Sequence, residues 1–484
     1  MRPALLSGIA VVLAVCAFQL WISPGNPPGF FRDEAALAYN AYSIEQSGRD
    51  EYGARFPLYF SSFLDYKSPI FVYTLASVFR VTGPDREVAR GLAAASILVA
   101  VLLLGWLGYR LSGRTAVGVA AAAVAGFCPW FFELGRVALE VSMEPLLLAT
   151  VLLGVERAAR IDDWRARGAL PVALALGAIT YVYAGGRFLA PLLAASLLVL
   201  ANRSRRSWVA TAIGGFAVTQ IPLLLYEHAH PGALSRRFDA TTFIHEGVSW
   251  FEILWRTGFN YVQDIQLWHY IVSGDSKPYA HTPGASALLA GSVALSVAGV
   301  VLVLRHHRDD AFWRYALAAL VVSPLPAAIT IDRFHALRLA PFAVMLVVFA
   351  IPSVEALMRT PHRRVLGIAV AVAGAVQLLV FVHDYSTDGP LRGGRFEAGI
   401  PDLLAQGWKN GGTVYVDYDD LEPLTLARWY ALDHGISQQR VVRLPDGGIP
   451  PTGAIAFGRT QECDYSCTRI GRYGDYWIAR VEGG

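Results

Sequence analysis

The stretch FFRDEAALAYNAYSIEQSGRDEYGARFPLYFSSFLDYKSPI, residues 30–70, decides how this chain is interpreted. It follows a first apolar run, 5–22, and it is dense in acids, bases and aromatic side chains. The chain as a whole is 54% hydrophobic and only 16% charged, whereas soluble domains average about a quarter charged residues. Ionisable side chains beside a bilayer are costly and usually functional. We therefore interpret this stretch as an active site at a membrane, with Asp33 at its centre.

Outside this stretch, long apolar runs predict a polytopic α-helical membrane protein. The first run is expected to be a retained helix and not a signal peptide, because no small-residue cleavage site precedes Ser23. The run 69–81 is short and amphipathic, so it is expected to lie in the membrane interface or to enter the bilayer only partly. A template of about 20 apolar residues per span predicts about eleven transmembrane helices, at 4–22, 87–110, 116–134, 143–158, 169–184, 189–201, 208–226, 284–305, 312–330, 336–358 and 364–383.

Five short loops indicate the orientation. They follow the second, fourth, sixth, eighth and tenth predicted spans and read YRLSGRT, ERAARIDDWRAR, NRSRRS, RHHRDD and RTPHRR. Short Arg-rich loops remain in the cytoplasm. We therefore expect a cytoplasmic N-terminus, with the first loop (23–86), the large loop (227–283) and the tail after residue 383 all on the outer face.

The tail, 384–484, has no apolar span and is expected to be a small α/β domain outside the membrane, behind a transmembrane domain at 1–383. TVYVDY, VVRL, AIAFG and DYWIARV have the composition of strands, and LEPLTLARWYALDHG that of a helix ending at Gly435. The close spacing of Cys463 and Cys467 fits a disulfide and two free thiols equally well. The net charge of +3 is too small to indicate a nucleic-acid partner.

Asp33 and Glu34 stand at the start of a predicted helix, where negative charge is favourable. Adjacent carboxylates on a helix point about 100° apart. We therefore expect one of them to face a cavity while the other caps or packs. Tyr39, Tyr66 and Lys67 belong to the same outer loop and extend the candidate site.

The pattern RDE…Y followed by DYKSP resembles the polyprenyl-phosphate-dependent glycosyltransferases of the GT-C type, which include the protein O-mannosyltransferases and the lipid A aminoarabinose transferase. The resemblance continues over about residues 1–385. It is carried by the segments FELGRVALEVSMEPLLL, TYVYAGGRFLAPLL, NYVQDI…SGDSKPYAHTPG and SPLPAAITIDRFHALRLAP. It implies an inner-membrane enzyme of a bacterium that transfers one sugar from a polyprenyl phosphate to a hydroxyl of a glycan, lipid or protein on the periplasmic side.

The resemblance also implies roles for individual residues. Asp33 matches the catalytic aspartate, which would act as general base in an inverting displacement. Glu140 matches the second acidic position, with Glu144 as a near alternative. Either acid is also a candidate to pair with Arg136, and Glu140 has the four-residue spacing of a helix-surface pair. Lys67 matches the lysine expected to bind the donor phosphate.

Further cations and polar groups extend the predicted site. The additional phosphate-binding candidates are Arg187, Arg333 and Arg338, although Arg187 is equally suited to anchoring at the membrane interface. The substrate-binding candidates are Glu34, Tyr39, Tyr66, Tyr183, Asp275 and His281. The family's loop often has an arginine before the position of His281, where this chain has Ala280, which weakens the case for His281.

A divalent cation and two other functions stay open at this point. Magnesium or manganese would suit carboxylates such as Asp33 and Glu140, and no cofactor is required by the pattern. An oligosaccharide ligase or polymerase also uses lipid-linked donors, but it predicts a first loop without the acidic pair. A lipid transporter predicts inverted repeats and ionisable groups at the bilayer midplane, and the sequence shows neither.

Overall fold

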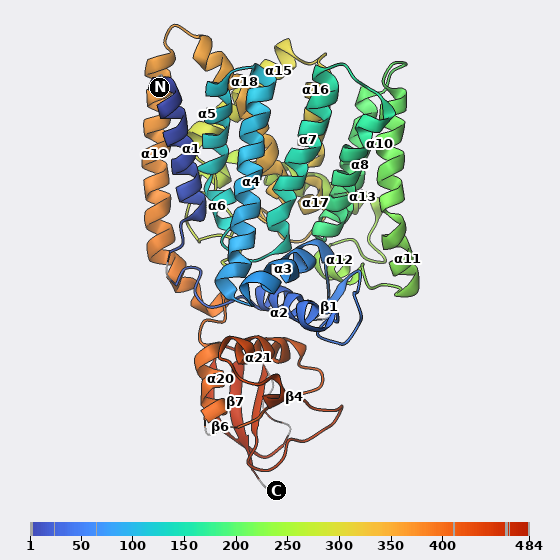
Figure 1. The fold of residues 1–484 in the computed structure, drawn as a ribbon, viewed down its shortest axis with the longest axis vertical. Coiled ribbons are helices and arrows are strands. Elements are labelled where there is room, and N and C mark those ends of the chain that lie inside the picture. The colour runs from blue at the N-terminus through green and yellow to red at the C-terminus, as the bar shows by residue number, and fades with distance from the viewer. Residues whose placement is uncertain are drawn as a thin grey trace. The chain divides into compact units, whose positions relative to one another are not determined.

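The computed structural model describes residues 3–23, 25–63, 65–409, 412–459, 463 and 465–482, and most of them are helical (Figure 1). The chain divides into two compact units. The first unit consists of Met1–Ile22 and Arg90–Ser386, and the second of Ser23–Ala89 and Thr387–Gly484. The contacts thus group the first loop with the tail. The predicted domain boundary at residue 383 stays a prediction.

The first unit contains the apolar helices, and each of the eleven predicted spans overlaps one or two of them. Their bounds are α1 (Pro3–Leu20), α4 (Arg86–Ser112), α5 (Thr115–Gly126), α6 (Pro129–Leu134), α7 (Glu144–Arg160), α8 (Leu170–Val182), α9 (Gly186–Ser196), α10 (Arg206–Thr219), α11 (Ile221–Ala229), α15 (Ala290–His306), α16 (Ala311–Val322), α17 (Leu325–Ala328), α18 (Ala340–Arg359) and α19 (Arg363–Asp388). The helices of the large loop are α12 (Arg236–Thr241), α13 (Trp250–Asp264) and α14 (Leu267–Val272).

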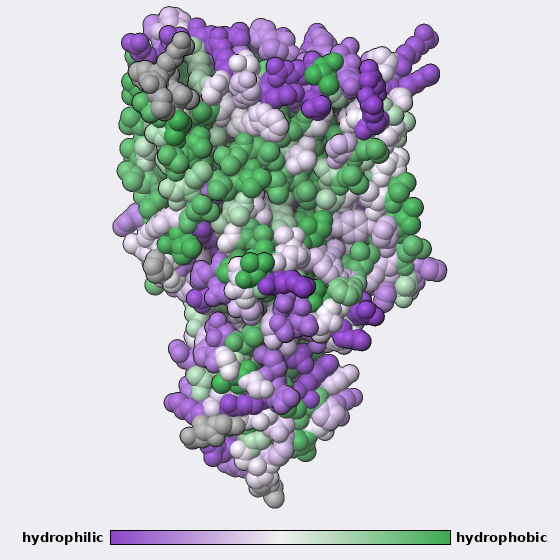
Figure 2. Space-filling view, viewed as in Figure 1, coloured by the Kyte–Doolittle hydropathy of each residue, from purple (hydrophilic) through white to green (hydrophobic). Residues whose placement is uncertain are grey.

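Five helical stretches in the described part of the chain are long and apolar enough to cross a membrane, and the other apolar helices are shorter. The five are Arg86–Ser112, Arg206–Ala229, Ala311–Ala328, Ala340–Arg359 and Arg363–Arg395. The chain is therefore a multi-pass membrane protein. Figure 2 shows the corresponding surface, a broad band of hydrophobic residues over the long helices with hydrophilic residues at their ends.

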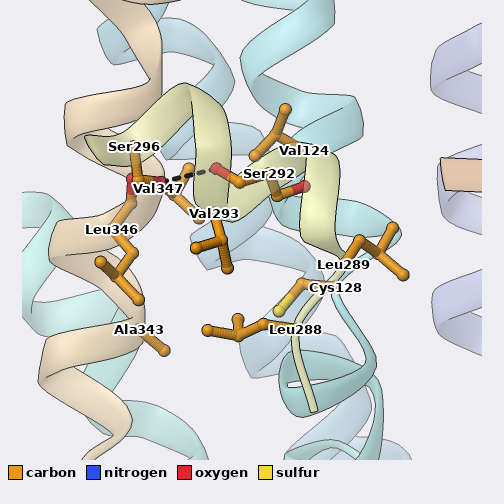
Figure 3. A pocket seen from close by; sticks show the side chains of 10 residues that line it. All are labelled: Val124, Cys128, Leu288, Leu289, Ser292, Val293, Ser296, Ala343, Leu346 and Val347. Carbon is orange, nitrogen blue, oxygen red and sulfur yellow. Dashed lines mark hydrogen bonds between the residues drawn. The ribbon is translucent and has the colours of Figure 1, made fainter. Parts of the chain in front are cut away.

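α18 lies at the centre of this unit, and its first 15 residues are all buried. Gly299 lets α15 approach it closely, since a Cβ at this position would fall 1.6 Å from the carbonyl oxygen of Phe349. Nearby, between α5, α15 and α18, lies a cavity of about 10 Å³ (Figure 3). It is lined mostly by aliphatic side chains, and the hydroxyl of Ser296 donates to the carbonyls of Ser292 and Leu346. We regard this cavity as a packing feature.

Three of the five Arg-rich loops lie at the same end of the helices. Residues from all three line one cavity of about 440 Å³, among them Arg110, Arg160 and His307. Arg110 also pairs with Glu156 at 3.0 Å. A shared end is what the positive-inside pattern requires of these loops, and their cytoplasmic location stays a prediction.

The second unit contains two parts of the chain that are far apart in sequence. The loop contributes α2 (Arg32–Ser47), the hairpin strands β1 (Phe60–Ser62) and β2 (Asp65–Lys67), and α3 (Pro69–Thr82). The tail contributes α20 (Ile400–Trp408), α21 (Leu421–Asp433) and a sheet of order β4-β3-β5-β7-β6. The strands are β3 (Val414–Val416), β4 (Val441–Arg443), β5 (Ile455–Arg459), β6 (Cys467–Tyr473) and β7 (Tyr476–Val481).

The predicted α/β character of the tail is confirmed. β3 pairs in parallel with β4 and β5, whereas β7 pairs antiparallel with β5 and β6. All four predicted strands and the predicted helix are present, and Gly435 follows the helix in the left-handed region that glycine tolerates. α20 and β6 were not predicted. Cys463 and Cys467 form a disulfide.

α2 packs against α21 of the tail through a polar junction centred on Glu51. One carboxylate oxygen of Glu51 accepts from Asn40 at 3.0 Å and the other from Thr425 at 2.8 Å. Arg428 donates to the main-chain carbonyl of Glu51 at 3.2 Å. Burial raises the pKa of Glu51 from 4.5 to about 7, although these hydrogen bonds oppose the shift. The first loop and the tail are therefore joined by a carboxyl group that titrates near neutrality.

We expect Glu51→Gln to be more favourable to stability at pH 8 than at pH 5, in each case relative to the wild type at the same pH. The folded state holds the Glu51 proton up to about pH 7, whereas an unfolded glutamate releases it near pH 4.5. The associated stability is complete below pH 4.5 and is lost as the pH rises through 7. The change in free energy of unfolding, variant minus wild type, should therefore be larger at pH 8 by on the order of 2 kcal/mol. Thermal unfolding at both pH values measures it, with the exposed Glu87→Gln as control, and equal differences at both pH values would contradict it.

Candidate active site

α2 begins with the acidic pair, and its two carboxylates are used differently. Glu34 is fully buried, and its Oε2 accepts from the main-chain N–H of Phe31 at 2.9 Å, which caps the helix. The side chain of Asp33 is 25% exposed. This is the division of roles expected for adjacent acids on a helix. The burial and capping of Glu34 give no support to a substrate-binding role for it.

Asp33 is held by Lys67, which the β1–β2 hairpin presents. Lys67 Nζ lies 2.9 Å from Asp33 Oδ1 and 3.5 Å from Asp65 Oδ2. The lysine side chain is only 8% exposed, so its charge is poorly screened and attracts both carboxylates. Two of the predicted site residues, 34 positions apart, are thus in direct contact.

The two tyrosines of this loop lie away from that contact. Tyr66 is flanked in β2 by Asp65 and Lys67, and successive side chains of a strand point to opposite faces, so its side chain points away from the face that carries Lys67. Tyr39 is buried, and its hydroxyl donates to Gln438 of the tail at 3.2 Å. Neither tyrosine has geometric support as part of the Asp33–Lys67 site.

A buried ionic network anchors the first turn of α2. Arg32 pairs with Glu397 at 3.1 Å and with Glu422 at 2.6 Å. Glu422 also pairs with Arg459 at 2.5 Å and accepts from Tyr476. Burial raises the pKa of Glu397 to about 8 despite the charge of Arg32. The residue next to Asp33 is therefore fixed to the tail by charges that are costly to separate.

In the first unit, Glu140 opens a short 3₁₀ turn and is 8% exposed. Arg136 does not take part in the helix-surface pair that the spacing suggested. Its Nη2 donates to the carbonyl of Gln19, and its guanidinium lies 4.4 Å from the ring centroid of Phe132. The spacing argument fails because residues 136–139 are not helical.

Tyr183 lies in the turn between α8 and α9, close to several charged groups. The positive charges of Arg338 and Arg237 and the negative charges of Glu140 and Glu144 all act on the Tyr183 hydroxyl. Two predicted site residues, Glu140 and Arg338, are thus near a third. Arg187, in the same turn, is partly buried and donates from Nη1 to the carbonyl of Leu234 at 3.0 Å.

Asp275 does not present its carboxylate to solvent. It is 2% exposed and accepts from the main-chain N–H groups of Lys277 at 2.8 Å and Ala336 at 2.7 Å. Burial raises its pKa to about 6. Asp275 therefore joins the large loop to the segment after α17, and this bonding gives a substrate-binding role no geometric support.

His281 is also buried, at 1% exposure. It forms an ion pair with Glu133 and bonds the carbonyl of Ala285 at 2.8 Å. Burial opposes its charged form, but Glu133 raises the pKa of His281. Glu133 additionally accepts from the main chain and hydroxyl of Thr282. His281 and Glu133 therefore hold the large loop against α6, and a substrate-binding role of His281 stays a prediction.

The two predicted arginines in the segment after α17 have different surroundings. Arg338 is buried and donates to Thr330 at 2.9 Å and to Asp332 at 3.2 Å. Arg333 is exposed, and its guanidinium lies 4.9 Å from the ring centroid of Phe259. Burial and the charge of Arg338 lower the pKa of His335 to about 3, so this ring is neutral. Of the two arginines, Arg338 bonds polar side chains of its own segment and Arg333 lies against an aromatic ring.

Two residues of this cluster were missed by the sequence analysis. Lys277 pairs with Asp332 at 2.9 Å, and Tyr279 bonds His335 at 3.2 Å. Burial raises the pKa of Asp332, but Lys277 and Arg338 outweigh it and lower the pKa overall. A cation inside SGDSKPYAHTPG was a visible signal for Lys277. In the described part of the chain, no group of three or more His, Cys, Asp or Glu side chains is arranged to hold a metal ion.

Comparison with known proteins identifies the fold. No family model and no curated protein matches the chain. Among solved structures, ArnT from Cupriavidus metallidurans matches with a TM-score of 0.62 in the apo state and 0.57 bound to undecaprenyl phosphate, in both cases at 15% identity over 99% of each chain. The archaeal oligosaccharyltransferase AglB from Archaeoglobus fulgidus, in complex with an inhibitory peptide and a dolichol-phosphate, matches with 0.52 at 12% identity over 89% of this chain and 64% of AglB.

These similarities show the fold and confirm the resemblance to GT-C glycosyltransferases at that level. The chain has the architecture of ArnT over its full length, including the tail. A further AglB structure, a complex with Zn and sulfate, matches with a TM-score of 0.51 at 11% identity over 87% of this chain and 61% of AglB.

Proposed function

We propose that this chain is an integral membrane glycosyltransferase that takes a monosaccharide from a polyprenyl-phosphate donor. The sugar passes to an acceptor hydroxyl of a glycan, lipid or protein on the periplasmic face of a bacterial inner membrane. The contact between Asp33 and Lys67 carries this proposal, because it joins a carboxylate with access to solvent to a buried cation. The ArnT-like fold supports it.

The proposed reaction is a single inverting displacement. Asp33 accepts the proton of the acceptor hydroxyl as that oxygen bonds the anomeric carbon. The bond between the anomeric carbon and the phosphate oxygen breaks, and its electron pair leaves with the polyprenyl phosphate. Lys67 stabilises the phosphate as a charge-assisted donor. The proton, the sugar and the leaving group are then all accounted for without another reactant.

The remaining predicted site residues differ in how well their surroundings suit the proposed roles. Arg338 and Arg187 stay candidates for the donor phosphate, and Glu140 and Tyr183 for the sugar or the acceptor, because they lie in outer turns of the first unit with access to charged neighbours. Arg333 is the weakest candidate, since it stacks on Phe259. A magnesium or manganese ion at the phosphate is left as an option. The carboxylate Asp33 has the right chemistry for it, and its lysine partner supplies charge without one.

The test is a transfer assay with defined donors. Purified protein in lipid nanodiscs is given polyprenyl-phosphate monosaccharides with a radiolabelled sugar, together with cell-envelope extract as acceptor. We expect label in the acceptor fraction and release of polyprenyl phosphate. Transfer only from a lipid-linked oligosaccharide would favour the alternative of a ligase or polymerase, and transfer from a nucleotide sugar would exclude the proposal.

A further inference from the structure

A polar open cavity of about 290 Å³ lies in the second unit, between α2 and the tail. Nine of its ten lining residues have side chains that can hydrogen-bond, and Val441 is the tenth. None of the ten belongs to the Asp33–Lys67 contact. Its volume is at the lower end of the range of about 300–1,000 Å³ for small-molecule sites, which is suited to a compact ligand.

One wall of this cavity is aromatic. Tyr39 and Tyr42 are three residues apart on α2 and therefore share a face of the helix, and their ring centroids lie 6.1 Å apart at an interplanar angle of 42°. Tyr39 is buried and bonded to Gln438. Tyr42 is partly exposed, and its hydroxyl has no hydrogen bond to any residue that the structure describes. The cavity thus offers one fixed ring and one ring available to a ligand.

Arg428 of α21 and Gln46 of α2 supply hydrogen-bond donors to this cavity. The guanidinium of Arg428 lies 5.9 Å from the ring centroid of Tyr39 and donates from Nη1 to the carbonyl of Glu51. Its other N–H groups bond no described residue and are not sealed from solvent. Gln46 is exposed on the same rim, and its amide bonds only the adjacent Glu45. The remaining N–H groups of Arg428 and the exposed amide of Gln46 are therefore accessible to a ligand.

The charges at this site nearly cancel. Arg428 faces Asp50, whose carboxylate accepts from the main-chain N–H groups of Tyr52 and Ala54. Burial raises the pKa of Glu51 to about 7, so this acid carries only part of a negative charge at neutral pH. A phosphate or a carboxylate ligand would meet two acids and one base. An acyl chain would find few apolar contacts here, because the side chains that line the cavity are mostly polar.

We propose that this cavity is a binding site for a neutral saccharide of one or two sugar units. Tyr42 stacks on the C–H face of a sugar ring, Arg428 and Gln46 donate to ring and hydroxyl oxygens, and Asp50 and Glu51 accept from hydroxyls. Aromatic rings combine a large contact area with few torsions to fix. A neutral sugar brings no charge that needs a counter-ion, and its hydroxyls find hydrogen-bond partners in this polar site.

The position of the cavity on α2 connects this site with the reaction. Tyr39 and Tyr42 follow Asp33 by six and nine residues, a distance of about 9 to 14 Å along the helix axis. On the basis of the proposed function, the saccharide bound here is the non-reacting part of the acceptor glycan. Contacts remote from the reacting hydroxyl can then contribute to positioning it.

Saturation-transfer difference NMR on the full chain, in a detergent without a sugar headgroup, tests the binding site. The probes are cellobiose, maltose and α-1,6-mannobiose, with glucose 6-phosphate as a charged comparison. We expect at least one neutral probe to bind with millimolar affinity, which is usual for few contacts, and more tightly than glucose 6-phosphate. Tyr42→Ala and Gln46→Ala should each weaken it by about fivefold or more. Tyr418→Ala, an exposed tyrosine of the tail outside the cavity, should have no effect.

The results separate the site from the proposed function. The saccharide site is overturned if no neutral probe binds, or if Tyr42→Ala and Gln46→Ala leave the binding unchanged. Binding of a neutral probe without transfer from any polyprenyl-phosphate sugar keeps the site and removes the reaction. Normal transfer by a folded Tyr42→Ala variant, with an unchanged KM for a glycan acceptor, removes the acceptor role alone.

Discussion

Asp33→Asn is expected to lower the rate of sugar transfer by about 10²- to 10⁴-fold, the usual contribution of a general base. Asparagine has nearly the shape of aspartate and can still accept from Lys67, but it cannot take the proton of the acceptor hydroxyl. The chain should stay folded, because the Asp33 side chain is partly exposed and Lys67 keeps Asp65 at 3.5 Å. Single-turnover transfer of labelled sugar in nanodiscs measures the loss.

Asp65→Asn is the matched control for this variant. Asp65 contacts the same lysine but is not the proposed base, so its substitution should change the rate much less than that of Asp33. Equal losses in the two variants would mean that the negative charge around Lys67 matters and that no base is identified. Substantial transfer by Asp33→Asn would move the base to Glu140.

The contact between Asp33 and Lys67 could be predicted from the sequence because both residues lie in one short loop with a recognisable pattern. The helix start at Arg32, the acidic first turn and the span before it are local features. The strands of the tail were likewise predictable where they are buried and apolar, as in β5 and β7. β6 was missed because it is an edge strand whose residues are polar and half exposed, so alternation gives no signal.

The partners of Arg32 could not be predicted in this way. Glu397 and Glu422 lie more than 360 residues away, and neither stands in a motif that indicates an ion pair. His281 shows the same limit, because its burial depends on Glu133, which lies 148 residues earlier in the sequence. In both cases the sequence identified an ionisable side chain, but its use was set by long-range packing that leaves no local pattern. The roles of loop acids and histidines are therefore the least predictable part of such a site.

Lys67→Met is expected to lower transfer by about 10²- to 10³-fold, the range found when one stabilising donor of a developing anion is removed. Methionine fills a similar volume at a position that is 8% exposed, but it leaves the departing phosphate without this cation. The binding of polyprenyl phosphate itself distinguishes this role from that of Asp33. Lys67→Met should bind the lipid more weakly, whereas Asp33→Asn should bind it equally well or more tightly, because the lysine loses its competing carboxylate.

Two further variants show whether the charge or the geometry of Lys67 matters. Lys67→Arg keeps the positive charge with a different donor geometry, so we expect partial recovery of lipid binding and a smaller recovery of transfer. Lys409→Met removes an exposed lysine of the tail and should change neither quantity. Unchanged binding of polyprenyl phosphate by Lys67→Met, in a folded protein, would show that other cations hold the phosphate. Lys67 would then act only by holding Asp33 in position through their contact at 2.9 Å.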